Sequence, residues 1–311
     1  MEYGFESESA KEFPSIVQLT ITNVCDMSCC HCPHSDYKKQ PGYKPSFMDM
    51  GLYRKVVDEM GQYDNTTLRI FGWGEPLLHP KLVEMIAYAT QQGVTTNLIT
   101  NGLNMDEKKI ISLIEGGLDL LEVSLDALTR ETYAKVRGNA KNFDRIFDNL
   151  HAFRFHRDRL NRTTYITASI INQPKAQHEV EGFTEYWSNH IDDVVLRQFH
   201  DFMGNAHDRD KIELPERHPC RCLWSRFNVN SEGLVSVCFN DWYNETILGD
   251  MNVPGTKISG IWKNSGYENM RQNDLNGTPK GVCKNCNDWI GASWEIPYEK
   301  LVAKAKSRFE K

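Results

Sequence analysis

The position of the cysteines constrains this chain more than any other feature of its sequence. The 311 residues include nine cysteines in two groups, which are Cys25, Cys29, Cys30 and Cys32, and then Cys220, Cys222, Cys238, Cys283 and Cys286. An odd number of cysteines, in a sequence that does not start like a secretory signal, argues against a disulfide framework. Thiols grouped in this way are typical of metal or iron–sulfur ligands. The sequence therefore predicts two metal centres.

Composition excludes several classes of protein. The chain has 36 Lys and Arg residues and 42 Asp and Glu residues, which gives a formal charge of −6, and 40% of its residues are hydrophobic. There is no strong basic run for nucleic acid, and the longest apolar stretch is far too short to cross a bilayer. We expect a cytoplasmic enzyme with a small-molecule substrate and with neither a nucleic-acid nor a membrane partner.

The hydrophobic pattern alternates between strands and helices. Strands are expected over residues 15–22, 66–71, 95–100, 120–125, 165–171 and 194–199, and a capping box at 46–49 is expected to begin the first of the intervening helices. Such alternation predicts an α/β fold with a parallel sheet, in which the ligand site lies at the carboxyl ends of the strands. The first cysteine group and the segments GWGEP, TNG and SLD follow successive strands, so we expect them to share one edge of the sheet.

The pattern changes in the last third of the chain. A polar, Pro-containing connector places a domain boundary between residues 207 and 208, which gives a core domain over 1–207 and a smaller domain over 208–311. A β-hairpin is expected over residues 226–239, followed by short helices and a tail helix. The small domain has few apolar residues, so a metal site would contribute to its folding.

Cys25, Cys29 and Cys32 lie within eight residues of one another on a loop after the first strand. Three thiols with His31 or His34 could bind zinc. Alternatively, three thiols could bind a four-iron cluster and leave one iron open to an external donor. The spacing alone leaves both interpretations open.

The order of the motifs resembles that of the radical S-adenosylmethionine (SAM) superfamily. CDMSCCHC resembles its cluster loop, GWGEP its GGEP motif, and the TNG and SLD segments its SAM-binding elements. This resemblance implies a partial (β/α)6 TIM-like barrel, a [4Fe–4S] cluster on Cys25, Cys29 and Cys32, and SAM on the open iron. It further implies SAM contacts at Gly72, Gly74, Glu75, Asn101, Ser124, Asp126 and Ile170. Arg137-Gly138-Asn139 also resembles an element that recurs in this superfamily, and the sequence does not define its role.

The same resemblance implies a reaction type. A reductant such as flavodoxin or ferredoxin would supply one electron, SAM would be cleaved to methionine and a 5′-deoxyadenosyl radical, and that radical would remove hydrogen from the substrate. The protein would position the substrate and exclude water.

The second cysteine group resembles the SPASM domain found at the C-terminus of many radical SAM enzymes. No cysteine follows Cys286, which implies the shorter twitch type with one auxiliary [4Fe–4S] cluster, as in radical SAM aminocyclitol dehydrogenases. Its ligands would be Cys220, Cys238, Cys283 and Cys286, with Cys222 as the alternative to Cys220. A structural zinc ribbon with four cysteine ligands would also satisfy this spacing.

Three hypotheses about function follow. The first is an oxidoreductase acting on an aminocyclitol, sugar or nucleotide sugar, because a first strand beginning near Ser15 leaves no room for a leader-peptide module. The second is a radical SAM epimerase or peptide maturase, and the third is a zinc-stapled binding protein without enzymatic activity. Arg197 and His200 are expected to contact substrate. Cys222, or alternatively Cys30, is a candidate for returning a hydrogen atom to a substrate radical.

Overall fold

A computed structural model of the chain describes residues 3–199, 202, 215–292, 294 and 298–309. The predicted domain boundary between residues 207 and 208 lies outside these residues, as does His200. In the described part of the chain, every helix is too short or too polar to span a membrane.

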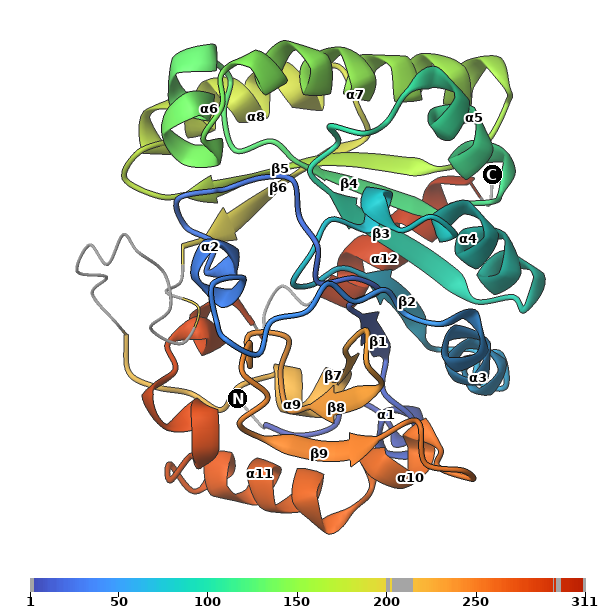
Figure 1. Cartoon of the computed structure of the whole chain (residues 1–311), viewed down its shortest axis with the longest axis vertical. Coiled ribbons are helices and arrows are strands. Elements are labelled where there is room, and N and C mark those ends of the chain that lie inside the picture. The colour runs from blue at the N-terminus through green and yellow to red at the C-terminus, as the bar shows by residue number, and fades with distance from the viewer. Residues whose placement is uncertain (1–2, 200–201, 203–214, 293, 295–297, 310–311) are drawn as a thin grey trace.

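Six parallel strands form a partial (β/α)6 TIM-like barrel, as the sequence predicted (Figure 1). These strands are β1 (Ile16–Leu19), β2 (Thr67–Ile70), β3 (Thr95–Thr100), β4 (Leu120–Ser124), β5 (Tyr165–Asn172) and β6 (Asp193–Gln198). They are neighbours in sequence order, so each strand enters the sheet beside the preceding one. The loops after the strands consequently meet at one edge of the barrel.

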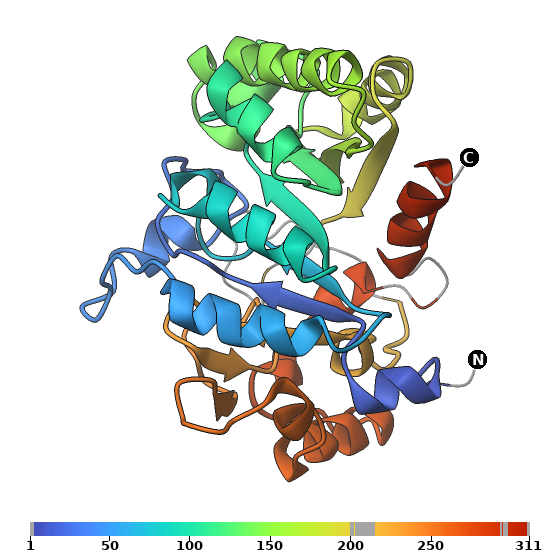
Figure 2. The same cartoon turned by 90° about the vertical axis from the view of Figure 1, so that its right-hand side faces the viewer.

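Helices connect the strands and cover the outside of the sheet (Figure 2). The helices between the strands are α2 (His34–Tyr37), α3 (Met50–Met60), η1 (Pro76–Leu78), α4 (Leu82–Gln91), α5 (Glu107–Glu115), α6 (Arg130–Arg137), α7 (Lys141–Arg159), η2 (Gln177–Glu179) and α8 (Val180–Ser188), and the short helix α1 (Glu8–Glu12) precedes β1. The expectation of a capping box at 46–49 was wrong in one respect. The N-cap of α3 is Asp49, whose carboxylate accepts a 2.6 Å hydrogen bond from the Gly51 N–H, and Ser46 lies outside the helix.

Strand burial explains how a site forms inside this barrel. Every residue of β1 and β2 is buried, as expected for parallel strands that are covered on both faces. Val17 and Leu68 belong to the apolar core, whereas Gln18 and Arg69 alternate with them on the opposite, inner face. The inside of the barrel is therefore polar near the carboxyl ends of its strands.

The C-terminal part continues the barrel sheet. Its elements are α9 (Cys222–Ser225), β7 (Arg226–Val229), β8 (Leu234–Ser236), β9 (Ile247–Asp250), α10 (Ile258–Trp262), α11 (Ser265–Leu275), η3 (Gly281–Asn285), η4 (Asp288–Gly291) and α12 (Tyr298–Phe309). β7 and β8 form the predicted hairpin. β7 also pairs in parallel with β1, with Arg226 opposite Ile16, so the complete sheet has nine strands in the order β6-β5-β4-β3-β2-β1-β7-β8-β9. The sequence predicted neither this pairing nor β9.

Candidate active site

One pocket at the carboxyl ends of the strands is lined by both cysteine groups. Cys25, Cys29 and Cys32 contribute from the loop after β1. The second group contributes Cys220, Cys222, Cys238, Cys283 and Cys286, so the structure brings all the predicted ligands to one pocket. The pairing of β7 with β1 accounts for this proximity, because it places the hairpin beside the strand that leads into the first cysteine loop.

Burial perturbs the thiols of the first group. It raises the pKa of Cys32 to about 12 and also raises the pKa values of Cys25 and Cys29. Isolated thiols in such surroundings stay protonated. A bound metal must therefore displace protons from these cysteines, and its binding supplies the free energy for that step.

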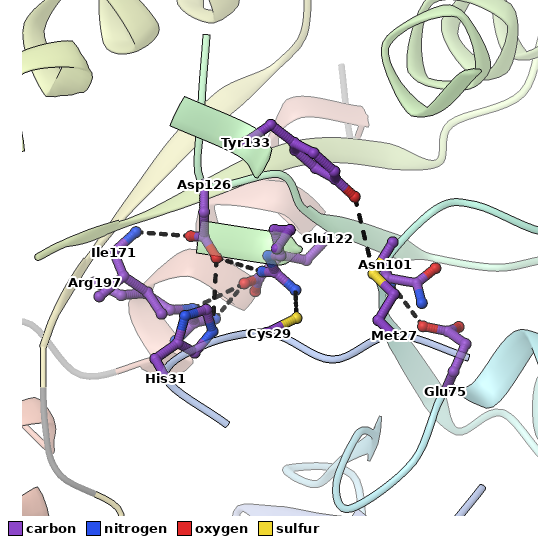
Figure 3. Close-up of polar contacts among 11 residues, drawn as sticks. Met27, Cys29, His31, Glu75, Asn101, Glu122, Asp126, Tyr133, Ile171 and Arg197 are labelled. Carbon is purple, nitrogen blue, oxygen red and sulfur yellow. Dashed lines mark hydrogen bonds and ion pairs between the residues drawn. The ribbon is translucent and has the colours of Figure 1, made fainter. Parts of the chain in front are cut away.

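Cys29 has a cationic neighbour from helix α6. Nη1 of Arg137 lies 3.5 Å from the Cys29 Sγ, and the other terminal nitrogen of Arg137 binds the carboxylate of Asp126. His31 approaches the same carboxylate, and its Nε2 lies 3.9 Å from the Asp126 Oδ2 (Figure 3). The loop and the segment after β4 thus meet through a buried, charged network.

The GWGEP turn packs directly on the chain that leads to Cys25. A Cβ on Gly74 would lie 2.4 Å from the carbonyl oxygen of Thr22 and 2.6 Å from that of Val24, and a Cβ on Gly72 would lie 1.8 Å from the Thr20 Oγ1. Only glycine permits this close approach. The Glu75 N–H donates to the Val24 carbonyl over 2.8 Å, which ties the turn to the cysteine loop.

Glu75 fastens this turn to the end of β3. Its carboxylate accepts hydrogen bonds from the Thr100 hydroxyl (2.6 Å), the Leu77 N–H (2.9 Å) and the Asn101 N–H (2.8 Å). Burial nevertheless raises the pKa of Glu75 to about 7. Both Glu75 and Asn101 line the pocket (Figure 3).

The remaining predicted SAM contacts are not equally exposed to the pocket. Ser124 lines it, whereas Ile170 is fully buried in the core and the adjacent Ile171 lines the pocket instead. Successive residues of a strand point to opposite faces, so Ile170 and Ile171 face different sides of β5, and the SAM contact at Ile170 stays a prediction. Asp126 is also buried, and one of its oxygens accepts a 2.8 Å hydrogen bond from the Ile171 N–H.

Arg197 lies in the pocket wall on β6, and its role as a substrate contact stays a prediction. Its Nε donates to the Glu122 Oε1 over 3.0 Å, and one terminal nitrogen binds the same oxygen (Figure 3). Burial disfavours the Glu122 carboxylate, but Arg197 and Arg69 outweigh it and hold its pKa below the usual value. The guanidinium side chain is 34% exposed, so it remains within reach of a ligand.

The auxiliary cysteines come from three segments. Cys220 lies just before α9 and Cys222 begins it, Cys238 follows β8, and Cys283 and Cys286 lie in and after η3. A hydrogen bond between the Cys220 and Cys222 thiols raises the pKa of the first and lowers that of the second. Since both thiols line the pocket, the choice of Cys220 over Cys222 as a ligand stays a prediction.

Several pocket residues were missed by the sequence reasoning. Trp73 of the GWGEP turn donates from Nε1 to the Phe239 carbonyl over 2.5 Å and stacks on Trp242, with 5.8 Å between ring centroids. Arg69 also lines the pocket, with its guanidinium 4.9 Å from the centre of the Phe71 ring. A charged residue inside the short apolar strand TLRI was the signal that could have identified Arg69.

The donor set suits iron–sulfur clusters. Among the described residues, no three His, Cys, Asp or Glu side chains are arranged to hold a single metal ion. The pocket is instead lined by two sets of thiols together with the Gly74 turn. A cluster is larger than a single ion and is held by thiolates on loops, so the residues present fit this group.

The barrel and the two thiol sets define an iron–sulfur enzyme with its site at the carboxyl ends of the strands. Comparison with protein families agrees. Residues 19–172 match the radical SAM superfamily, and residues 220–287 match the SPASM iron–sulfur cluster-binding domain. The chain therefore belongs to the radical SAM superfamily and carries a SPASM domain; its cofactors are SAM, a SAM-binding [4Fe–4S] cluster and an auxiliary [4Fe–4S] cluster.

Curated relatives are similar over part of their length. The Fe-coproporphyrin III synthase of Methanosarcina barkeri is 30% identical over 159 residues, which are 49% of this chain and 39% of that protein. The GTP 3′,8-cyclase of Chlorobaculum tepidum is 28% identical over 211 residues, or 63% of this chain and 60% of that protein. The chain thus matches less than two thirds of either relative.

Solved structures extend the similarity of fold to almost the whole chain. BtrN in complex with AdoMet and 2-DOIA superimposes with a TM-score of 0.62 at 19% identity, covering 96% of this chain and 99% of that one. SuiB of Streptococcus suis bound to S-adenosylmethionine gives a TM-score of 0.68 at 13% identity, covering 94% of this chain and 75% of that one.

Proposed function

We propose that this chain is a radical SAM oxidoreductase that oxidises a small hydroxylated substrate, an aminocyclitol, sugar or nucleotide sugar. The observation that carries the proposal is the single pocket lined by both cysteine groups. A substrate held in this pocket would lie between the site of hydrogen abstraction and an electron acceptor. The fold similarity to BtrN, which covers nearly the full length of both chains, is consistent with this architecture.

In this proposal, Cys25, Cys29 and Cys32 hold the SAM-binding cluster, and Cys220, Cys238, Cys283 and Cys286 hold an auxiliary cluster. When bound, these groups and SAM supply the 5′-deoxyadenosyl radical and an acceptor for one electron. Flavodoxin or ferredoxin is the proposed reductant. The Gly72–Gly74 turn, Asn101 and Ser124 form the wall that receives SAM.

The substrate would be oriented by groups of the chain itself. Arg197 presents guanidinium N–H groups to the pocket and is held from beneath by Glu122. Such a fixed donor suits a hydroxyl or phosphate oxygen. Phe71, Trp73, Phe239 and Trp242 line the pocket with aromatic surface, which suits a sugar-like ring and excludes water.

A second candidate function is epimerisation. Cys222 lines the pocket and is not needed if Cys220 is the fourth ligand, so its thiol is available to return a hydrogen atom to a substrate radical. Turnover in deuterated water distinguishes the two functions. Oxidation gives a ketone without deuterium at the reacting carbon, whereas deuterium fixed there without net oxidation would contradict the oxidoreductase proposal.

Cysteine variants test the assignment of the two centres. Cys29→Ala is expected to abolish 5′-deoxyadenosine formation, because the SAM-binding cluster loses a ligand. Cys283→Ala is expected to permit SAM cleavage and to block product formation. Cys30→Ala, which removes the thiol next to Cys29, serves as the control and is expected to retain both activities. Full product formation by the Cys283 variant would rule out the electron-acceptor role.

A further inference from the structure

Helix α6 ends directly against the first cysteine loop. The Cys30 N–H donates to the carbonyl of Val136 in the last turn of the helix, over 2.9 Å. The helix is then terminated by Gly138 in a left-handed conformation with φ of 96°, where a Cβ would lie 3.1 Å from the Ser28 carbonyl oxygen. The last turn of α6 is therefore fixed relative to the loop that carries Cys29.

Arg137 uses this fixed position to reach the Cys29 sulfur. Its side chain is only 10% exposed, and its Nη1 lies 3.5 Å from Sγ, a distance suited to an N–H···S hydrogen bond. Nη2 binds the Asp126 carboxylate at the same time. The guanidinium thus connects a predicted cluster ligand to an acidic residue of the barrel.

Asp126 is itself held in place by the barrel strands. Its backbone has a φ of 58°, its N–H donates to the Ser169 carbonyl over 3.1 Å, and its Oδ1 accepts from the Ile171 N–H. Figure 3 shows Asp126 joined by dashed lines to Ile171 and His31, with Cys29 below it. A left-handed conformation at a residue other than glycine is rare, and here it is fixed on both sides by β5.

Arg137 brings a buried positive charge to the Cys29 sulfur, and the Asp126 carboxylate, which is 1% exposed, holds the guanidinium there. Cationic hydrogen-bond donors at cluster sulfurs favour the more reduced state of an iron–sulfur cluster.

We propose that Arg137 is a positioning residue for the SAM-binding cluster, in which its hydrogen bond to Cys29 makes that cluster easier to reduce. The inference rests on the proposed role of Cys29 as a ligand. The step it affects is the transfer of one electron from the external reductant to the cluster, in which no bond of the protein forms or breaks. The Arg137-Gly138 element thereby has a physical role.

The test is the midpoint potential of the cluster in the reconstituted protein with both clusters present. Arg137→Gln removes the charge and keeps a polar side chain. The midpoint potential of this variant is followed by EPR in the absence of SAM. We expect the equilibrium constant for reduction to fall about tenfold, which lowers the potential by about 59 mV for one electron. Addition of SAM to a parallel sample identifies the signal of the SAM-binding cluster.

A matched control lies on the same helix. Arg130→Gln removes an equal charge from a side chain that is 64% exposed and paired with Asp144, and it is expected to leave the potential unchanged. Arg137→Lys keeps the cation with a shorter reach, so its potential is expected to lie between those of the parent and the Gln variant.

The outcomes separate this inference from the proposed function. If the Arg137→Gln variant retains full iron and has the parent potential, the positioning role is wrong, because loss of the hydrogen bond has then left the cluster unchanged. If the Gln variant loses iron, the midpoint potential of the Lys variant is used instead. A potential of the Lys variant equal to that of the parent protein would overturn the inference. If the parent protein itself assembles no SAM-responsive cluster, the proposed function fails.

Discussion

At the scale of single residues, close approach of the backbone explains the glycines of GWGEP. Gly74 contacts the carbonyl oxygens of Thr22 and Val24 just before the first predicted cluster ligand, Cys25. The absence of a side chain therefore serves to bring two loops together, and Glu75 then fixes the turn to β3 through Asn101. A substitution at Gly74 is therefore expected to displace the cysteine loop although no cysteine is replaced.

Gly74→Ala is expected to separate these loops. A methyl group 2.4 Å from a carbonyl oxygen forces a backbone shift, and such overpacking costs about 1–3 kcal/mol in the free energy of unfolding. Denaturant unfolding of the apo protein measures this loss, and the iron content after reconstitution is expected to fall with it.

Gly42→Ala provides the control for this substitution. Nothing lies within 4 Å of the position of its Cβ, so its stability and iron content are expected to match those of the parent. Equal iron content and stability in the Gly74 and Gly42 variants would contradict the close-packing explanation.

The sequence identifies residues of the pocket where they belong to a motif with local spacing. The predicted cysteine ligands of both groups line the pocket, and so do Glu75 and Asn101. The predicted SAM contact Ile170 and the pocket residue Ile171 lie on opposite faces of β5, because a shift of one residue reverses the face of a strand. The contact of Arg137 with Cys29 depends on how α6 meets a loop more than 100 residues earlier in the chain, and no local pattern encodes that.

At the scale of elements, helix α11 is attached through a buried cation. Arg271 is 2% exposed and donates to the carbonyls of Leu223 and Trp262, each over 2.9 Å. Its guanidinium carbon also lies 4.2 Å from the Trp262 ring centre and 4.8 Å from that of Phe5. One side chain therefore joins α11 to α9, α10 and the N-terminal segment.

Arg271→Met is expected to destabilise the C-terminal part. The apolar replacement leaves two buried carbonyls without a donor, and each such group costs about 1–3 kcal/mol. We expect the free energy of unfolding to fall by about 3 kcal/mol in a denaturant titration. Arg54→Met is the matched control, because Arg54 is half exposed and its pair with Glu84 is worth less than about 1 kcal/mol. A loss no larger than that of the control would contradict this role for Arg271.

Element types were predictable because their hydrophobic periods are strong. The six barrel strands occur where the sequence placed them, within a few residues. The short strand β9 was missed since Ile247–Asp250 has no alternating pattern of its own and depends on pairing with β8. Tertiary contacts thus decide the weakest elements.

At the scale of the whole molecule, the parallel pairing of β1 with β7 is what creates the site. It joins the first barrel strand to a segment about 200 residues later and brings the two cysteine groups to one pocket. The resemblance to the radical SAM and SPASM families implied two centres, but the long-range pairing that unites them in one sheet is visible only in three dimensions. Trp73 and Trp242 strengthen this junction across the pocket.

The central claim is that the thiols of Cys25, Cys29 and Cys32 hold a four-iron cluster with one iron open to SAM. Mössbauer spectroscopy of 57Fe-reconstituted, anaerobic protein tests it most directly. We predict quadrupole doublets of two [4Fe–4S]2+ clusters and, on addition of SAM, a distinct component from one iron of a single cluster. Spectra without cubane iron, from folded protein that retains stoichiometric zinc, would contradict the account.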